Sequence, residues 1–331
     1  MRELRRMQVD GEVTSLEIVS VFIKRTILYG IPEQYTADVN FLRAIETAKE
    51  KDRMLAEARE SKKLDELPLL HGIPFSIKDM FHLKGTASTL GLLKRALTID
   101  HRTSPLVELL MREGAYVFVK SHTSQFTVPH TISPLFGESL HAMNKKLSGG
   151  GSTGGEGGLI TTGCSPFGIG TNIGGSVNVP SAWNGLAGLS TTYRRLPAQP
   201  WLGANFGFNI PRRLFNSTTG LMAKYADDIR FIMQACCQER SFRRFSEMAP
   251  LPFNVELCDT PKKRKLRFGV YDLGVMKRTP ITRRALQEAR DILERAGHEC
   301  VDIPTNAQMI EDVRAIVSKG MSPAQKNNSF G

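Results

Sequence analysis

Long apolar runs are absent from this sequence of 331 residues. A membrane-spanning helix needs about 20 consecutive, mostly apolar residues, and no stretch of the chain approaches that length. The first residues also lack the charged segment and apolar core of a secretory signal peptide. We therefore expect an intracellular chain, cytoplasmic or peripherally associated with a membrane, without a signal peptide or a transmembrane span.

Cysteine is scarce, and its spacing does not suit disulfides or metal sites. The five cysteines form no C-x-x-C pair, and any pairing leaves one over. They are Cys164, Cys236, Cys237, Cys258 and Cys300. His122 and His130 likewise lack partners at the spacing of a metal site. We expect reduced thiols and no bound metal.

Acidic residues are fewer than basic ones. The chain has 33 Asp and Glu against 44 Lys and Arg, a formal net charge of +11. Such a charge would suit an anionic membrane surface or nucleic acid. The basic residues are scattered, however, apart from Lys262–Lys265 and the pair Arg212 and Arg213, and solvated loops explain both groups more simply. We expect no nucleic-acid partner, and the 41% hydrophobic composition is sufficient for a large core.

Glycine, in contrast, is concentrated in two loops, Ser148–Gly158 and Gly168–Ser176. Glycine has no Cβ and adopts positive φ, so such loops let backbone amides approach a ligand closely. Neither loop ends in the Lys-Ser or Lys-Thr pair of a phosphate-binding loop, and the glycine spacing after Gly168 does not fit a dinucleotide-binding turn. Apolar residues between the glycines argue against a flexible linker. The pattern favours a hydroxyl, that of Ser176, beside N–H groups that could bind a developing oxyanion in acyl transfer.

Three blocks of sequence resemble a known family. The blocks His71–Asp79, Gly150–Ile160 and Gly168–Gly188 occur in the order and at the spacing of the amidase-signature hydrolases. In detail they resemble the fatty-acid amide hydrolases, and the similarity extends over residues 10–305. A single glycine or serine motif is a weak signal, but the combination at family spacing is specific.

The resemblance implies a Ser-Ser-Lys catalytic triad at Lys78, Ser152 and Ser176. Lys78 would be the general base, Ser152 the proton relay, and Ser176 the nucleophile that forms an acyl ester. This chemistry is reasonable, because burial among apolar groups lowers the pKa of a lysine amine and lets it activate a serine hydroxyl. Alternating apolar residues predict a buried strand over residues 69–78 that carries the Lys78 amine into the interior. Taken singly, the lysine would be a solvated strand end and each serine a turn residue.

The resemblance also assigns residues that bind the substrate. The expected oxyanion donors are the backbone amides of Ile173, Gly174, Gly175 and Ser176, and the expected cavity residues are Phe126 and Thr127. No metal or organic cofactor is implied, since side chains and backbone fill every role.

The sequence departs from the family pattern at several positions. Asn172 and Asn178 replace an Asp and an Arg, and a joint loss of both charges predicts a compensated pair with reduced activity. Gly149 replaces a Pro, and Ser190-Thr191 replaces a Lys-Pro.

Alternating helix and strand patterns predict an α/β chain with the amidase-signature fold, a central mixed β-sheet covered by helices on both faces. Helical periodicity occurs over residues 14–28, 38–64, 104–113, 225–237 and 280–296, and further strands are expected at 115–119, 266–271 and 300–303. The aromatic residues of Trp201–Phe208 and the pair Leu214 and Phe215 are expected to pack.

One amidase-signature domain is expected over residues 1–310. The family domain continues beyond such a point, so its C-terminal part is expected to be missing here. Residues 311–331 are expected to form a polar, poorly ordered tail.

The expected function is hydrolysis of carboxylic amides, with fatty-acid or other hydrophobic amides as substrates implied by the resemblance. Relatives often dimerise, so a homodimer and peripheral contact with a membrane stay open. Two alternatives remain: the glutamine-hydrolysing subunit of a tRNA amidotransferase, and a catalytically silent, truncated relative that binds hydrophobic amides without cleaving them.

Overall fold

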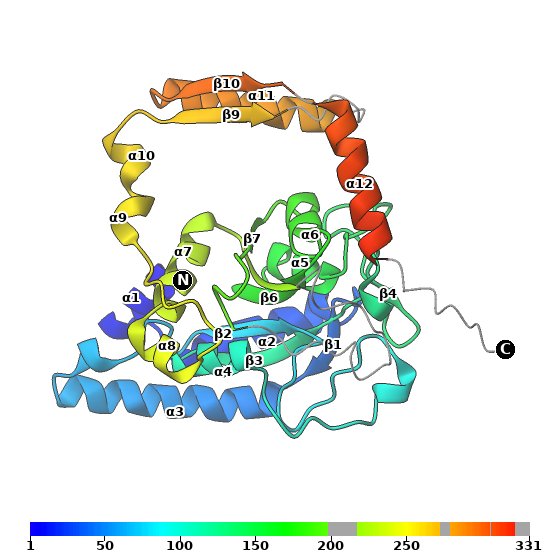
Figure 1. The fold of residues 1–331 in the computed structure, drawn as a ribbon. Helices are drawn as coiled ribbons and strands as arrows, with labels where there is room; N and C mark the ends of the chain where they lie inside the picture. The colour runs from blue at the N-terminus through cyan, green and yellow to red at the C-terminus, as the bar shows by residue number, and fades with distance from the viewer. Residues whose placement is uncertain (198–216, 272–278, 305, 322–331) are drawn as a thin grey trace. The chain divides into compact units, whose positions relative to one another are not determined.

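A computed structural model describes residues 1–197, 217–271, 279–304 and 306–321 (Figure 1). The chain divides into two compact units, and the boundary in the second half of the chain lies between Phe253 and Asn254. The aromatic residues of Trp201–Phe208 and the pair Leu214 and Phe215 lie outside the described residues.

The first unit is built on a six-stranded mixed sheet with the strand order β1-β3-β2-β6-β8-β7. The strands are β1 (Thr36–Val39), β2 (Pro74–Lys78), β3 (Tyr116–Ser121), β6 (Phe167–Asn172), β7 (Ala187–Ser190) and β8 (Thr218–Ala223). Strand β2 pairs in parallel with both β3 and β6, whereas β1, β7 and β8 pair antiparallel with their neighbours. A separate hairpin joins β4 (Ile132–Ser133) to β5 (Gly137–Glu138). The central mixed sheet confirms the predicted fold class.

The three central parallel strands are buried along their length. Every residue of β2 and β3 is buried, as are the first five of β6. Parallel strands covered on both faces have continuous rather than alternating burial. Glycine at two positions of β6 leaves room for a neighbouring helix, because a Cβ at Gly168 would overlap the Glu156 carboxyl and one at Gly170 would lie 2.9 Å from Thr153 Cγ2.

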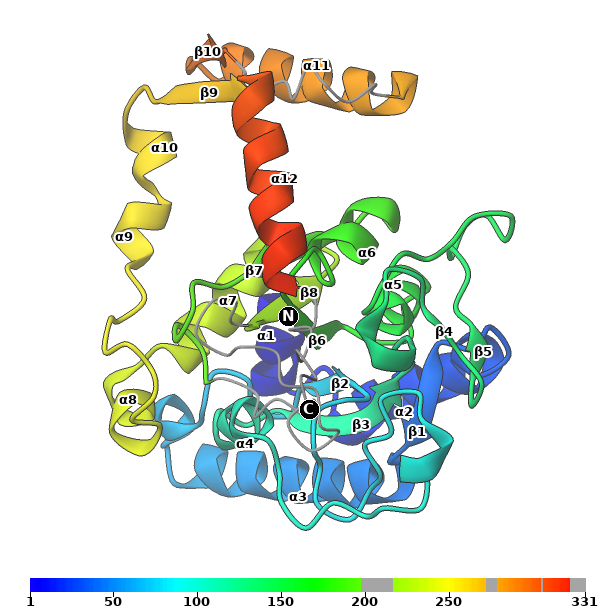
Figure 2. The same ribbon diagram turned by 45° about the vertical axis from the view of Figure 1, so that its right-hand side comes forward.

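Helices pack on the sheet from two sides. Figures 1 and 2 show α3 along one side and α5 and α6 on the opposite side. The helices of this unit are α1 (Arg2–Asp10), α2 (Ser15–Arg25), α3 (Phe41–Glu60), α4 (Pro105–Arg112), α5 (Gly154–Thr161), α6 (Asn178–Trp183), α7 (Ala226–Cys236) and α8 (Glu239–Arg244). Short helical turns occupy η1 (Thr26–Gly30), η2 (Leu64–Glu66), η3 (Leu93–Arg95) and η4 (Gln125–Thr127).

The starts of two predicted helices have different causes, one local and one tertiary. A capping box starts α2: Glu17 N donates to Thr14 Oγ1 at 3.0 Å, and Thr14 N donates to the Glu17 carboxylate at 2.8 Å. The helix predicted from residue 38 begins at Phe41 instead, because Thr36–Val39 pairs with β3 as strand β1. Tertiary pairing there overrides the helical periodicity.

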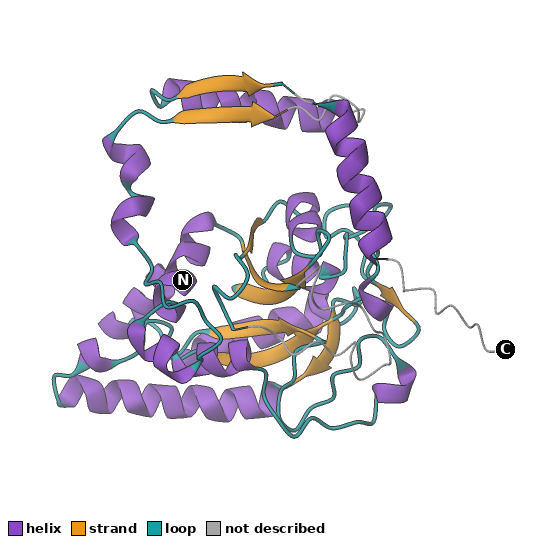
Figure 3. Cartoon of the chain, in the orientation of Figure 1, coloured by secondary structure: helices purple, strands orange, loops and turns teal. Residues whose placement is uncertain are grey.

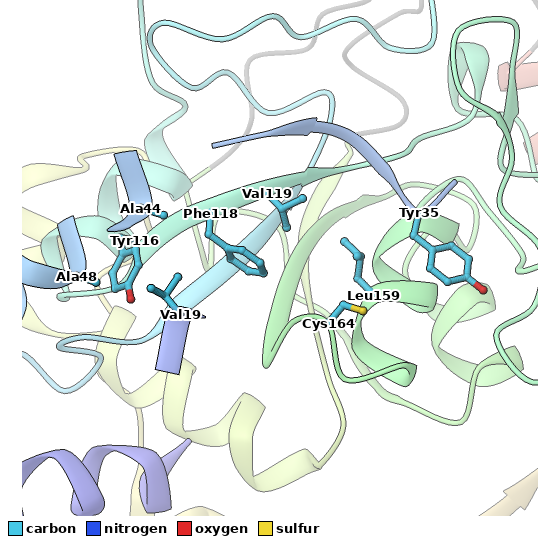
Figure 4. Packing of buried hydrophobic residues seen from close by; sticks show 9 residues of the cluster. All are labelled: Val19, Tyr35, Ala44, Ala48, Tyr116, Phe118, Val119, Leu159 and Cys164. Carbon is cyan, nitrogen blue, oxygen red and sulfur yellow. The ribbon is translucent and has the colours of Figure 1, made fainter. Parts of the chain in front are cut away.

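The core joins both helices and sheet, as Figure 4 shows. One cluster of buried residues combines α2, α3, β3 and α5: Val19, Tyr35, Ala44, Ala48, Tyr116, Phe118, Val119, Leu159 and Cys164. A second, smaller cluster places Ile160 against Val177 and Met222. All five cysteines are free thiols.

The second unit contains a β-α-β arrangement. Strand β9 (Arg267–Tyr271), helix α11 (Pro280–Arg295) and strand β10 (Glu299–Ile303) follow in sequence, and the two strands pair in parallel in a sheet of their own, separate from the six-stranded sheet. Helices α9 (Val255–Cys258) and α10 (Thr260–Lys263) precede it and α12 (Ala307–Met321) follows (Figure 3).

Helix α12 corrects the expected tail in part. Residues 311–321, expected to be a polar, poorly ordered tail, belong to this helix. Apolar Ile310, Val313 and Ile316 recur at helical spacing within the segment, which is the signal for a helix. Residues 322–331 lie outside the described residues. No helix in the described ranges is long and apolar enough to cross a membrane.

Candidate active site

Strand β2 carries Lys78 into the interior of the first unit. The Lys78 side chain is fully buried, and its Nζ donates to Ser152 Oγ at 2.6 Å. The same Nζ lies 3.4 Å from Thr171 Oγ1 of β6. The structure thus brings together two of the three residues of the implied triad, which lie far apart in the sequence.

Burial sets the protonation of the Lys78 amine. Loss of solvation lowers its pKa to about 7, because the charged ammonium form is disfavoured away from water, and the nearby Glu156 acts in the opposite direction. A lysine with such a pKa holds a substantial neutral fraction near pH 7. The amine can therefore accept a proton there.

Ser152 lies in the first glycine loop, just before helix α5 begins at Gly154. Its peptide bond with Gly151 is cis, and its carbonyl oxygen accepts a hydrogen bond of 2.9 Å from Thr123 Oγ1. The loop packs tightly, since a Cβ at Gly151 would overlap the Pro129 carbonyl and Gly150 has a φ of +78°. Glycine is required at both positions, and the backbone there fixes where the Ser152 hydroxyl points.

Ser176 lies in the turn that joins β6 to α6 and is half-buried. Its hydroxyl makes no hydrogen bond to another residue of the described chain, so the structure does not join it directly to Ser152 or Lys78. Strands β2 and β6 are parallel, and their carboxyl ends meet at one edge of the sheet. Lys78 ends β2, and Ser176 follows the end of β6, so both belong to that edge.

The turn before Ser176 is organised by the Asn172 side chain. Asn172 Oδ1 accepts from Gly175 N at 3.1 Å and from Val177 N at 3.0 Å. Gly175, with a φ of +116°, takes a conformation that side chains disfavour. The Gly175 amide is thus already engaged. Of the four amides expected to bind an oxyanion, those of Ile173, Gly174 and Ser176 donate to no atom in the described ranges.

Asn172 contacts Ser190, not Asn178. Its Nδ2 donates to Ser190 Oγ at 2.9 Å, Ser190 Oγ lies 3.1 Å from Thr218 Oγ1, and Thr218 Oγ1 donates to Asn172 O at 3.3 Å. Asn178 is exposed, and within the described residues no hydrogen bond links it to Asn172. Asn172 thus bonds to Ser190, another position that departs from the family pattern, and the compensated loss of the two charges stays a prediction.

Phe126 and Thr127 lie on the turn η4 after β3. Both have positive φ, 53° and 61°, and the Phe126 side chain is 45% exposed. Nearby, Ser124 N donates to Ser152 O at 3.4 Å. The segment therefore passes beside the Ser152 loop.

The sequence reasoning overlooked three polar residues around Lys78. Thr171 contacts the Lys78 amine and donates to Met80 Sδ at 3.0 Å. Glu156 and Ser76 are fully buried and hydrogen-bonded to each other. The available signals were a lone glutamate within a glycine loop, and a serine two residues before Lys78 on a strand that is otherwise apolar. The described residues hold no group of three or more His, Cys, Asp or Glu that could bind a metal ion.

Comparison with known proteins decides the family. The family model described as Amidase matches residues 17–328. The chain belongs to the amidase family. This confirms the resemblance seen in the three sequence blocks.

Individual relatives agree with this assignment. The amidase-family chain is 37% identical over 241 residues to fatty-acid amide hydrolase 1 of Sus scrofa, covering 72% of the chain and 41% of that protein. It is 31% identical over 302 residues to the acetamidase of Aspergillus oryzae, covering 89% of the chain and 54% of that protein. A solved structure of a fatty acid amide hydrolase superposes with a TM-score of 0.78 at 25% identity, covering 93% of the chain and 53% of that structure. The chain spans about half the length of the curated relatives it matches.

Proposed function

We propose that this chain hydrolyses carboxylic amides through an acyl-enzyme on Ser176, with Lys78 as the general base and Ser152 as the proton relay. The observation that carries the proposal is the 2.6 Å contact between the buried Lys78 amine and the Ser152 hydroxyl. Family membership and the amide-cleaving relatives support the same reaction.

In the first half-reaction, Ser176 Oγ attacks the amide carbonyl carbon. Its proton moves to Ser152 Oγ, and the Ser152 proton moves to Lys78 Nζ. The carbonyl oxygen becomes an oxyanion, and the open backbone amides of Ile173, Gly174 and Ser176 would stabilise it. The carbon–nitrogen bond then breaks, and the proton returns along the relay to the leaving amine.

In the second half-reaction, water attacks the acyl ester on Ser176. The neutral Lys78 amine again accepts a proton through Ser152, the ester bond breaks, and the carboxylic acid leaves. The proton returns to Ser176, so the free enzyme is regenerated without change in Lys78 or Ser152.

Fatty-acid or other hydrophobic amides are the proposed substrates. Identity of 37% to a fatty-acid amide hydrolase supports this class. Because another relative is an acetamidase, acetamide is a suitable short substrate to compare with a long-chain amide. Hydrolysis of a long-chain primary amide should therefore be faster than that of acetamide, and glutamine should be inert without a partner subunit.

Covalent labelling with a fluorophosphonate probe tests the reaction directly. Ser176 should carry the label, as mapped by mass spectrometry, and Ser176→Ala should abolish it. Lys78→Ala and Ser152→Ala should slow labelling sharply while circular dichroism shows a folded chain. Absence of label on folded wild-type protein would reject the hydrolase and leave a silent, amide-binding relative.

A further inference from the structure

Behind the Lys78 amine lies a second buried ionisable group, the Glu156 carboxyl. Glu156 is in the first turn of α5, one turn beyond Ser152. Its carboxyl packs on Gly168 of β6, where a Cβ would overlap it, and it bonds to Ser76 Oγ of β2. Ser76 and Lys78 are two residues apart on a strand, so their side chains project from the same side of β2.

Lys78 and Glu156 are not an ion pair. Among the described residues neither takes part in a salt bridge, although the buried Lys120 and Asp79 nearby lie 3.5 Å apart. Glu156 Oε1 is buried and has no hydrogen bond of good geometry in the described residues, although the buried Ser121 hydroxyl also acts on this carboxyl and lowers its pKa. An ionised carboxylate with so few donors would be costly, because a buried charge needs a counter-charge or several hydrogen bonds.

The oxygen atoms around Ser76 indicate where the proton lies. Ser76 Oγ contacts Glu156 Oε2, Ser165 Oγ at 2.9 Å and Phe167 O at 3.2 Å, and Ser165 Oγ lies 2.8 Å from Phe167 O. An ionised Glu156 leaves only the two serine protons for these four contacts. A protonated Glu156 supplies a third proton. The carboxyl then donates to Ser76 Oγ, which leaves both serine hydroxyls free to donate to the remaining oxygen atoms.

We propose that Glu156 is a positioning residue that holds a proton at neutral pH, so that Lys78 keeps a neutral amine able to accept the Ser152 proton. This inference rests on the proposed function, since it explains how the proposed base is kept ready. One proton is shared by two buried groups, and its location on the carboxyl leaves both without charge. The alternative, an ammonium and a carboxylate, would bury two charges that do not touch.

The electrostatics of the surroundings agree with this assignment. Burial raises the pKa of Glu156 to about 8, against the opposing effects of the Ser76 and Ser121 hydroxyls and of the Lys78 charge. The charge of each group bears on the pKa of the other: Glu156 raises that of Lys78, and Lys78 lowers that of Glu156. On β3, Lys120 is bonded to Ser88 and paired with Asp79. The His122 ring is bonded to Ser133 and Ser139, and burial lowers its pKa to about 4.

Infrared difference spectroscopy tests the protonation without any turnover. Wild type minus Glu156→Gln should show the carbonyl band of a protonated carboxylic acid at pH 7. Lys78→Met should keep this band. A band that is absent from wild type and appears only in Lys78→Met would mean an ion pair and overturn the proposal. Should Glu156→Gln fail to fold, the comparison of wild type with Lys78→Met still decides.

The matched control is Glu113, a buried carboxylate whose oxygen lies 3.1 Å from Arg240 Nε. Glu113→Gln should leave the protonated-acid band unchanged, because that carboxylate has a guanidinium partner.

The pH dependence of Ser176 labelling gives a readout that a merely structural role would not move. Coupled groups titrate in two macroscopic steps, so wild type should show two inflections and Glu156→Gln only the lower one, at an unchanged position. A downward shift of that inflection by about one pH unit or more in Glu156→Gln would show an anionic Glu156 and overturn the proposal. An identical profile in both proteins would also overturn it. If no protein labels at any pH, the proposed hydrolase fails, and the infrared band still decides the protonation of Glu156.

Discussion

The Lys78 amine is held away from water at the end of β2, with one hydroxyl of Ser152 at hydrogen-bond distance. A lysine in water keeps its proton near pH 7 and cannot act as a base. Here burial removes that obstacle, since desolvation destabilises the ammonium form. The basicity of the Lys78 amine is therefore set by its buried position and not by the lysine side chain itself.

The labelling rate of Ser176 should rise with pH through about 7, whereas an unperturbed lysine would place that rise near 10.5. Below a pH of about 7 the Lys78 amine is protonated and accepts no proton. Above that pH the amine is neutral, so the labelling rate increases with pH. First-order rate constants for the fluorophosphonate reaction across this range provide the measurement. Lys78→Met should remove the dependence, and a rate that falls as pH rises through 7 would contradict the role of Lys78.

Asn172 should stabilise the turn that holds Ser176, because its side chain bonds to the amides on either side of that residue. Asn172→Ala removes the acceptor for two amides and the donor to Ser190, so the free energy of unfolding should fall by about 1–3 kcal/mol. Labelling of Ser176 should slow without a change in its pH dependence. Urea unfolding and labelling kinetics measure the two effects.

Asn178→Ala is the control for this prediction, because Asn178 is exposed. Its effect on unfolding should stay within about 0.5 kcal/mol. A double-mutant cycle between Asn172→Ala and Ser190→Ala should show coupling. Equal losses in the two asparagine variants would contradict the arrangement.

The elements that position these residues have local and tertiary causes. Helix α2 begins where Thr14 and Glu17 form a capping box, and its apolar face joins the core through Val19. Strand β6 admits the Glu156 side chain of α5 only because Gly168 has no Cβ. The start of α2 thus has a local cause, and the packing of α5 on β6 depends on the absence of a side chain at Gly168.

Removal of the α2 cap should destabilise the first unit without touching the chemistry. Thr14→Ala leaves the Glu17 amide without its side-chain acceptor, and the free energy of unfolding should fall by about 1 kcal/mol. Ser20→Ala on the same helix is the control, since its exposed hydroxyl bonds only to Leu16 O among the described residues. Thermal unfolding by circular dichroism provides the measurement. A loss in Ser20→Ala as large as that in Thr14→Ala would argue against the cap.

For the molecule as a whole, the first unit is held by one large core and a mixed sheet. Phe118 of β3 is fully buried and lies against Phe22 of α2, with ring centroids 6.3 Å apart. Such residues fix the distance between the sheet and the helices. The spacing of the proposed catalytic groups at the sheet edge depends on that packing.

Phe118→Ala should be strongly destabilising. Truncation of a buried aromatic ring leaves a cavity and should lower the free energy of unfolding by about 3–5 kcal/mol. Leu42→Ala, at a side chain that is 84% exposed, should change it by less than about 0.5 kcal/mol. Urea titration measures the free energy of unfolding of wild type, Phe118→Ala and Leu42→Ala. A Phe118→Ala protein as stable as Leu42→Ala would refute this account of the core.

The sequence alone determined the family, the fold class and most helices and strands, because these depend on residues close together in the chain. Strand β2 could be predicted from the alternation before Lys78, and the parallel pairing of β9 with β10 from the helix between them. The start of α3 could not, since residues 36–39 follow their partner strand rather than their periodicity.

Only the tertiary structure decided the partners of the polar side chains. Lys78 meets Ser152 from 74 positions away, and Glu156 meets Ser76 from 80. Asn172 bonds to Ser190 and not to Asn178. Such contacts are set by the order and register of strands that are distant in sequence, and periodicity carries no information about either. Desolvation, which lowers the pKa of Lys78, likewise arises only once the sheet and α5 have closed around it.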